Sequence, residues 1–156
     1  MIYVTNAVPV NESGEPALTR GDIWAGLEQK ANNALPFVPA MTQCEVLERR
    51  GDREFDREIE FRGQRFTERI TLEPESRVTF TRLAGDVLGT IANEIEEDES
   101  GELSLRFSFA LVLKGVAPGS AEEAEYAEGM KGDYLKAVEA TLAAIRRVAR
   151  GEAVGV

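Results

Sequence analysis

The chain has 156 residues, of which 18 are Lys or Arg and 28 are Asp or Glu, so its formal net charge is −10. A chain of this length supports one hydrophobic core, and we predict a single domain over residues 1–156. The negative charge opposes the phosphate backbone of nucleic acids, so we expect no nucleic-acid partner.

The absence of histidine and the presence of only one cysteine, Cys44, limit the chemistry of the chain. They exclude Ser/His and Cys/His catalysis, an intrachain disulfide and the usual zinc and iron ligand sets, so we predict no metal and no cofactor. Any acid or base must be a carboxylate, Tyr, Lys or Cys. Because no secretory signal follows Met1 and no apolar run approaches about 18 residues, we expect a cytoplasmic protein without a membrane span.

The N-terminal part predicts a strand followed by a helix. Residues 2–10 are rich in β-branched and aromatic side chains and run into a polar cluster at 11–14, which is typical of a strand and a turn. Thr19 and Asp22 then form a helix capping signal, and the pattern ends at Pro36. The apolar residues of this helix share one face and are Ile23, Trp24, Leu27, Ala31 and Ala34.

Residues 41–113 alternate between apolar and polar side chains with a period of two, which predicts six strands. Short runs of turn residues separate the segments, as in a meander of antiparallel hairpins. These runs are Arg50-Gly51-Asp52, Arg62-Gly63-Gln64, Glu73-Pro74-Glu75-Ser76, Ala84-Gly85-Asp86 and Asp98-Glu99-Ser100-Gly101. The last segment, 102–113, has the strongest alternation of the chain.

The C-terminal part predicts one long helix over residues 121–150. Ser120 and Glu123 form a capping signal at its start, and Gly151 is suited to its C-terminal cap. Apolar residues recur every three or four positions and form one stripe, which consists of Ala127, Met130, Tyr134, Val138, Leu142 and Ile145. Gly129 and Gly132 are unusual inside a helix, and they leave open whether the helix is kinked there or begins after them.

The order of these elements predicts an α+β fold. An antiparallel sheet with one solvated face must cover its apolar face, and the terminal helix is the only element long enough to do so. We therefore expect a helix-grip fold, in which a curved seven-stranded antiparallel sheet wraps around a long C-terminal helix. One helix and a short helical turn lie between the first and second strands.

This order resembles the START-like or SRPBCC superfamily, which includes pathogenesis-related allergens, lipid-transfer START domains and polyketide cyclases. Several local motifs are similar to those of a small bacterial and fungal branch of unknown function. They are Leu18-Thr19-Arg20 with Trp24 and Leu27, Phe37-Val38-Pro39, Cys44-Glu45-Val46-Leu47-Glu48, and Gly85-Asp86 with Gly89 and Ile91-Ala92-Asn93. The resemblance implies a hydrophobic cavity between the sheet and the terminal helix, and it implies no particular reaction.

Two charged residues share the inward parity of the apolar strand residues. Arg57 lies on the face of Phe55 and Ile59, and Glu68 lies on the face of the next segment's apolar residues. A two-residue loop at Arg62 would place Arg57 directly opposite Glu68. The pair is either a structural ion pair at the cavity wall or a functional pair. In the functional case, Arg57 orients an anionic ligand group while Glu68 holds the guanidinium or moves a proton.

Further residues are predicted to line the cavity. Asn93 shares the inward parity and suits a ligand carbonyl, although a buried Asn satisfied by the protein is an equal alternative. Arg82 has inward parity too, but it lies so close to a turn that we expect it to be solvated. The predicted apolar and aromatic lining consists of Phe55, Phe107, Tyr126, Met130 and Tyr134.

These features support one leading function and two alternatives. The leading hypothesis is a small-molecule binding protein that holds a hydrophobic or aromatic ligand, with Arg57, Glu68 and Asn93 as polar contacts. The first alternative is a cyclase- or dehydratase-like enzyme in which Glu68 or Tyr134 exchanges protons and Arg57 stabilises an enolate. The second is a co-chaperone-like protein-interaction module. The sequence is compatible with either a monomer or an oligomer.

Overall fold

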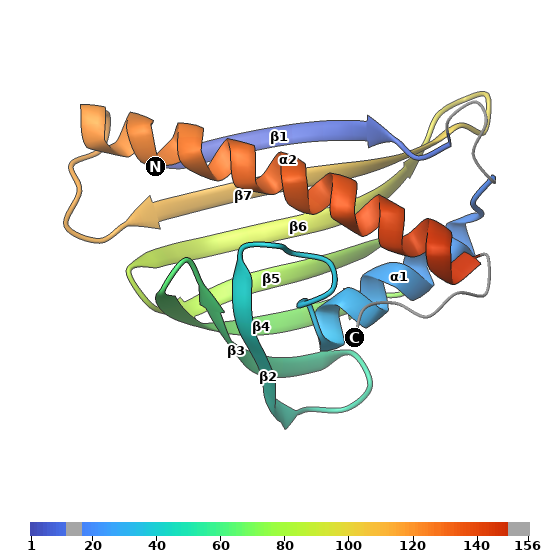
Figure 1. The fold of residues 1–156 in the computed structure, drawn as a ribbon, viewed down its shortest axis with the longest axis horizontal. Coiled ribbons are helices and arrows are strands. Elements are labelled where there is room, and N and C mark those ends of the chain that lie inside the picture. The colour runs from blue at the N-terminus through green and yellow to red at the C-terminus, as the bar shows by residue number, and fades with distance from the viewer. Residues whose placement is uncertain (12–16, 150–156) are drawn as a thin grey trace.

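The computed structural model describes residues 1–11 and 17–149. Two helices and seven strands make up these ranges (Figure 1). In chain order they are β1 (Ile2–Pro9), α1 (Arg20–Asn32), β2 (Met41–Arg49), β3 (Glu54–Phe61), β4 (Gln64–Glu73), β5 (Arg77–Ala84), β6 (Val87–Glu97), β7 (Leu103–Leu113) and α2 (Ala121–Ala149).

All seven strands form one antiparallel sheet with the order β1-β7-β6-β5-β4-β3-β2. Strands β2 to β7 are a meander, and β1 adds to its far edge by pairing with β7. Figure 1 shows α2 running diagonally across one face of the curved sheet, with α1 beside the C-terminal half of α2. The predicted helix-grip α+β fold is confirmed.

The predicted start of α1 is confirmed in detail. Thr19 accepts a hydrogen bond from the backbone of Asp22, and the Asp22 carboxylate accepts one from the Thr19 backbone. The buried face of α1 contains four of the predicted apolar residues, whereas Ala34 is buried beyond the end of the helix, and it also contains Lys30. The first helix therefore carries a charged side chain into the interior, which the sequence analysis did not anticipate.

The two helices approach each other closely at Gly26 of α1. A Cβ atom placed on Gly26 would lie 2.2 Å from Cγ1 of Ile145, so only glycine fits at this crossing. Val138, Leu142 and Ile145 are all buried, as expected for the part of α2 that packs on the sheet and on α1. This half of the interface is an ordinary apolar core.

Helix α2 is continuous through Gly129 and Gly132, so the helix does not begin after them. Both glycines are exposed, and a Cβ atom added to either would meet nothing within 4 Å. Ser120 accepts a hydrogen bond from the Glu123 backbone at the predicted cap. The predicted C-terminal cap at Gly151 lies outside the described residues. Neither α1 nor α2, as described, has a stretch that is long and apolar enough to cross a membrane.

Candidate functional site

The β3–β4 hairpin sets the position of the first two site residues. Phe61 pairs with Gln64, so the loop is the two residues Arg62 and Gly63, with φ angles of 51° and 77°. Two consecutive positive φ angles are typical of the tight turns that suit hairpins. Arg57 therefore pairs directly with Glu68, as predicted.

Arg57 and Glu68 form a buried ion pair. Nη2 of Arg57 lies 2.9 Å from Oε1 of Glu68, and Nε donates to the same oxygen at 3.0 Å. Nη1 of Arg57 donates to the carbonyl oxygens of Lys30 and Ala31 at 3.1 and 3.0 Å. These carbonyls lie in the last turn of α1, where the helix itself supplies no donor. Arg57 thus joins β3, β4 and the end of α1, and most of its donors are already used.

Arg82 of β5 contradicts the expectation of a solvated side chain, because only 5% of it is exposed. Its Nε donates to Oε2 of Glu68 at 3.3 Å, and its guanidinium carbon lies 4.1 Å from the centre of the Phe66 ring. A register shift between Thr67 and Glu68 places Glu68 opposite Arg82. Nη1 of Arg82 is buried and has no hydrogen-bond partner among the residues that the structure describes. The inward parity of Arg82 correctly indicated a buried side chain, whereas its proximity to the turn was misleading.

Lys30 is the site residue that the sequence analysis missed. Its Nζ donates to Oδ1 of Asn93 at 3.0 Å and lies 5.9 and 5.7 Å from the ring centres of Phe80 and Phe107. The pKa of Lys30 is lowered to about 7. Burial is the main cause, nearby Arg57 acts in the same direction, and Glu68 opposes the change. A signal was available, since Lys30 lies three residues after Leu27 and four before Ala34 on the apolar face.

The buried cluster carries a surplus of positive charge. Two guanidiniums, Arg57 and Arg82, share the single carboxylate of Glu68, and Lys30 lies in the same group. Asn93, only 1% exposed, faces inward as predicted and is neutral. A buried charge without a counterion is costly, so this arrangement favours an anionic or electron-rich partner.

The cluster lines a cavity of about 50 Å³ beneath α2. Its other walls are mostly apolar; the lining residues named so far are joined by Val38, Met41, Ile59, Phe61, Ile91, Asp133, Tyr134 and Ala137. This volume is enough for a few water molecules. Ligand pockets are usually about 300–1,000 Å³, so the cavity by itself admits only part of a ligand.

Two larger hollows share lining residues with the cavity, and a third shares lining residues with one of these hollows. A hollow of about 180 Å³ shares Phe61 and Asp133 with the cavity, and one of about 520 Å³ shares Gln64 and Tyr126 with the first hollow. A third hollow, of about 240 Å³ on the β1 side, shares Tyr134 with the cavity. The hollows therefore follow the first half of α2, beginning near the point where β7 ends.

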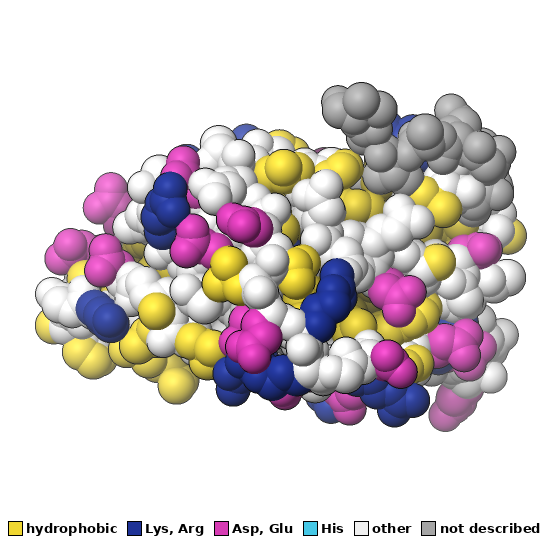
Figure 2. Space-filling model, turned by 90° about the horizontal axis from the view of Figure 1, so that it is seen from below, with side chains coloured by type: hydrophobic (Ala, Val, Ile, Leu, Met, Phe, Trp, Pro, Cys, Tyr) yellow, Lys and Arg dark blue, Asp and Glu magenta, His cyan; other side chains and the backbone are white. Residues whose placement is uncertain are grey.

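Apolar side chains reach the surface at this end of the molecule. Figure 2 shows a group of hydrophobic side chains at the lower left, with charged side chains also present at this end. Leu83 and Val112 are exposed and lie near the ends of β5 and β7.

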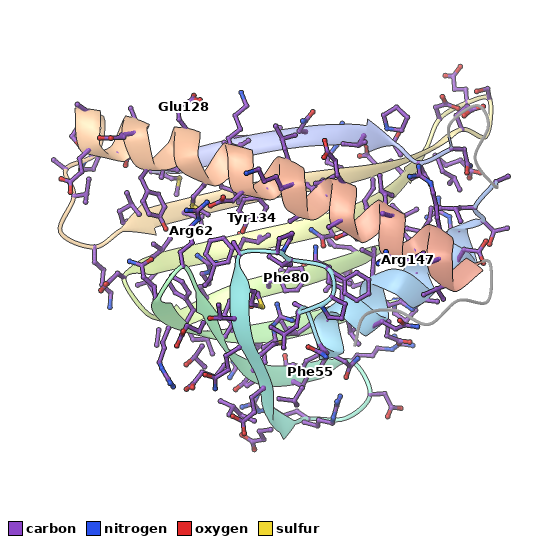
Figure 3. All side chains as sticks on the ribbon, in the orientation of Figure 1. Phe55, Arg62, Phe80, Glu128, Tyr134 and Arg147 are labelled. Carbon is purple, nitrogen blue, oxygen red and sulfur yellow. The ribbon has the colours of Figure 1, made fainter. Side chains whose placement is uncertain are left out.

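An ion pair spans the hollows between the hairpin tip and α2. Nε of Arg62 donates to Oδ2 of Asp133 at 2.6 Å, and Nη2 of Arg62 donates to Oδ1. In the view of Figure 3, Arg62 and Tyr134 are seen below the first half of α2, and Tyr134 and Phe80 both line the cavity. The Arg62 side chain is exposed and Asp133 lines both the cavity and a hollow, so this pair links the surface of the hairpin tip to the wall of the cavity.

The predicted aromatic and apolar residues lie in three different places, namely the cavity, the adjoining hollows and the core. Tyr134 lines the cavity and stacks on Phe109 at 4.7 Å, and burial raises its pKa well above the ordinary value, so it is a hydrogen-bond donor and not a base. Tyr126 and Met130 line the hollows under α2, and Phe107 lines the hollow near β1. Phe55 is buried beside Arg49 and lies on the wall of none of these four spaces.

A curved antiparallel sheet that grips a long helix is the START-like, or helix-grip, fold. The chain belongs to the AtaL family, because residues 4–151 match the family model described as acetylaranotin biosynthesis cluster protein L.

Solved structures with this fold cover nearly the whole chain. The Zhui aromatase/cyclase from Streptomyces sp. R1128 has a TM-score of 0.69 and 19% identity, covering 97% of this chain and 98% of its own. A START superfamily protein from Mycobacterium smegmatis has a TM-score of 0.66 and 16% identity, covering 91% and 97%. Ara h 8.0201 has a TM-score of 0.57 and 15% identity, covering 90% and 97%. No curated protein sequence matches the chain.

Proposed function

We propose that the protein binds a small hydrophobic or aromatic molecule that carries an acidic or carbonyl oxygen. The observation that carries this proposal is Nη1 of Arg82, a buried cationic donor without a partner on the wall of an apolar cavity. A buried cationic donor is costly to leave unpaired, and a ligand oxygen would accept its hydrogen bond. Asn93 and Tyr134 supply further polar contacts on the same wall.

The division of polar roles differs from the one expected from the sequence. Arg57 is occupied by Glu68 and by the end of α1, so its contribution is to hold the cluster together. Arg82 is the cation that would contact the ligand. The oxygen of the ligand would enter the small cavity, while its apolar body would occupy the adjoining hollows of about 180 and 520 Å³.

The comparisons support a small organic molecule as the ligand. The family name refers to a biosynthesis cluster, and one neighbour is an aromatase/cyclase, which acts on small molecules. Charge argues in the same direction, since an interior surplus of positive charge in a chain of net charge −10 suits an acidic or carbonyl group.

Uptake of 8-anilinonaphthalene-1-sulfonate, an aromatic fluorophore with one anionic group, tests the proposal. We expect saturable fluorescence enhancement, and at least a tenfold weaker affinity in Arg82→Met, because losing one charge-assisted contact costs about 1.5–3 kcal/mol. Arg65→Met is the matched control, since Arg65 is exposed and pairs with Glu58 on the solvent side. An absence of uptake by the wild-type protein, or equal affinity in both variants, would contradict the proposal.

A second candidate is an enzyme that acts on a carbonyl compound, and the position of Tyr134 favours it. A protonated phenol and the Arg82 guanidinium line one cavity, and together they could stabilise a developing enolate. Glu68 is less suited to act as the base, because both of its oxygens accept hydrogen bonds from guanidinium groups. If an aromatising β-polyketone substrate is turned over, Tyr134→Phe should lower kcat strongly while Tyr126→Phe should not.

A further inference from the structure

Lys30 differs from every other lysine of the chain. The chain has four lysines, and Lys114, Lys131 and Lys136 are all exposed whereas Lys30 is only 7% exposed. Lysines on helices usually extend their ammonium group to water. Lys30 instead ends inside, on the wall of the cavity.

The contacts of Lys30 suit a neutral amine. An ammonium group has three donors, and the Nζ of Lys30 has one hydrogen-bond acceptor, Oδ1 of Asn93. The two nearest aromatic rings, Phe80 and Phe107, offer only weak acceptors at more than 5.5 Å. A neutral amine has two N–H donors instead of three, so fewer donors are left unpaired when it is buried.

The charges around Lys30 favour the same state. Arg57 on β3 and Arg82 on β5 are cationic, and Glu68 on β4 is shared between them. On α2, Tyr134 is uncharged and Asp133 is paired with Arg62, while β6 contributes the neutral Asn93. Burial and, to a smaller extent, Arg57 lower the pKa of Lys30 to about 7 while Glu68 opposes the change, so the free amine is accessible near neutral pH.

We propose that Lys30 is a nucleophile that forms an imine with an aldehyde or ketone group of the bound molecule. A desolvated lysine beside another cation is a known way to activate an amine. The inference rests on the proposed function, because the carbonyl group must first enter the cavity. It makes the ligand class more specific, namely an apolar or aromatic carbonyl compound.

The reaction balances without an added oxidant or reductant. The lone pair of Nζ forms a bond to the carbonyl carbon, and one proton moves from nitrogen to the former carbonyl oxygen, which gives a carbinolamine. That oxygen then leaves as water, taking a second proton from nitrogen, and a C=N bond remains. The free donor on Nη1 of Arg82 is suited to stabilise negative charge on the oxygen while the first bond forms.

Reductive trapping locates the reacting amine. The full chain is incubated at pH 7 with 2-naphthaldehyde and sodium cyanoborohydride, and labelled peptides are identified by mass spectrometry. We expect Lys30 to be labelled at least tenfold faster than Lys131 or Lys136, because an exposed lysine with a pKa near 10.4 is almost fully protonated at pH 7. The amine of Met1 is also reactive, and its peptide is resolved separately.

Competition and substitution make the result specific. Added 2-naphthoic acid should slow labelling at Lys30 and leave labelling at Met1 unchanged. Lys30→Arg should remove the label from this site, whereas the matched control Lys136→Arg should keep it. If Lys30→Arg does not fold, the peptide map of the wild-type protein decides the question.

Two outcomes overturn the inference, and they are distinguishable. Normal uptake of 8-anilinonaphthalene-1-sulfonate with no preference for Lys30 refutes the imine and leaves the proposed binding function standing. If neither fluorophore uptake nor labelling of Lys30 occurs, both the inference and the proposed function are refuted.

Discussion

The two halves of α2 meet the rest of the molecule in different ways. The second half packs Val138, Leu142 and Ile145 into a closed apolar core, and Gly26 lets α1 approach it directly. The first half covers hollows, and the surfaces facing it carry buried charged groups. The same helix therefore packs into the core at one end of the fold and covers a polar cluster at the other.

This difference separates stability from function within one element. Leu142 and Ile145 in the second half are buried and line none of the four spaces, so their packing leaves no room for a ligand. Facing the first half, the Arg82 guanidinium and the Lys30 amine, whose pKa burial lowers to about 7, lie in the interior, where apolar side chains would cost less stability. The proposed binding function places the ligand under the first half, and four experiments test the comparison.

The largest expected effect is that of Glu68→Gln in the polar half. Removing this carboxylate leaves Arg57 and Arg82 buried without a counterion, which should cost about 3–5 kcal/mol of unfolding free energy in urea titrations. Glu58→Gln, which breaks an ion pair with the exposed Arg65 on the same hairpin, should cost no more than about 1 kcal/mol. Equal effects would mean that the buried cluster is not the electrostatic centre of the fold.

Ile145→Ala probes the apolar half. Deleting this fully buried side chain should cost about 3 kcal/mol of unfolding free energy and leave binding of 8-anilinonaphthalene-1-sulfonate unchanged. Met130→Ala removes a residue that already borders a hollow, so it should cost less and alter binding instead. The comparison fails if Ile145→Ala weakens binding as much as Met130→Ala does.

The pH dependence of stability tests Lys30. Its pKa in the folded protein is about 7, below the ordinary value of 10.5, so between these pH values the unfolded chain binds more protons and the wild-type protein becomes more stable as pH rises. The unfolding free energy of the wild type minus that of Lys30→Met should therefore increase by about 2 kcal/mol from pH 7 to pH 9. Lys136→Met should show no such change, and a flat difference for Lys30→Met would mean that Lys30 is an ordinary charged lysine.

The smallest effect on stability is expected for the ion pair at the roof of the hollows. Arg62→Gln should change the unfolding free energy by less than about 1 kcal/mol, because the Arg62 side chain is mostly exposed. It should nevertheless speed the association of 8-anilinonaphthalene-1-sulfonate in stopped-flow measurements, since Arg62 no longer ties the hairpin tip to Asp133. Arg65→Gln on the same hairpin is the control, and identical association rates in both variants would exclude a gating role.

Local patterns along the chain were sufficient to predict most of the architecture. The period of two, the capping signal at Thr19 and the stripe on the last helix each depend on residues a few positions apart. Even the pairing of Arg57 with Glu68 followed from local chemistry, because a two-residue turn fixes the register of a hairpin. The amphipathic stripe also predicted that α2 covers the sheet, although it could not show whether Gly129 and Gly132 interrupt the helix.

Only the tertiary structure decided which polar residues belong to the site. Lys30 meets Asn93 across 63 positions of sequence, and the end of α1 is held to β3 by Arg57 across 27. Such contacts depend on how α1 and α2 close over the curved sheet. The parity of Arg82 and the helix face of Lys30 pointed inward, but local patterns did not fix the partners of either side chain. The sequence by itself determined the fold and the face that carries the charges, because both depend on periodicity and turns. The size of the cavity and the roles of its charged groups depend on long-range packing, and they became visible only in three dimensions.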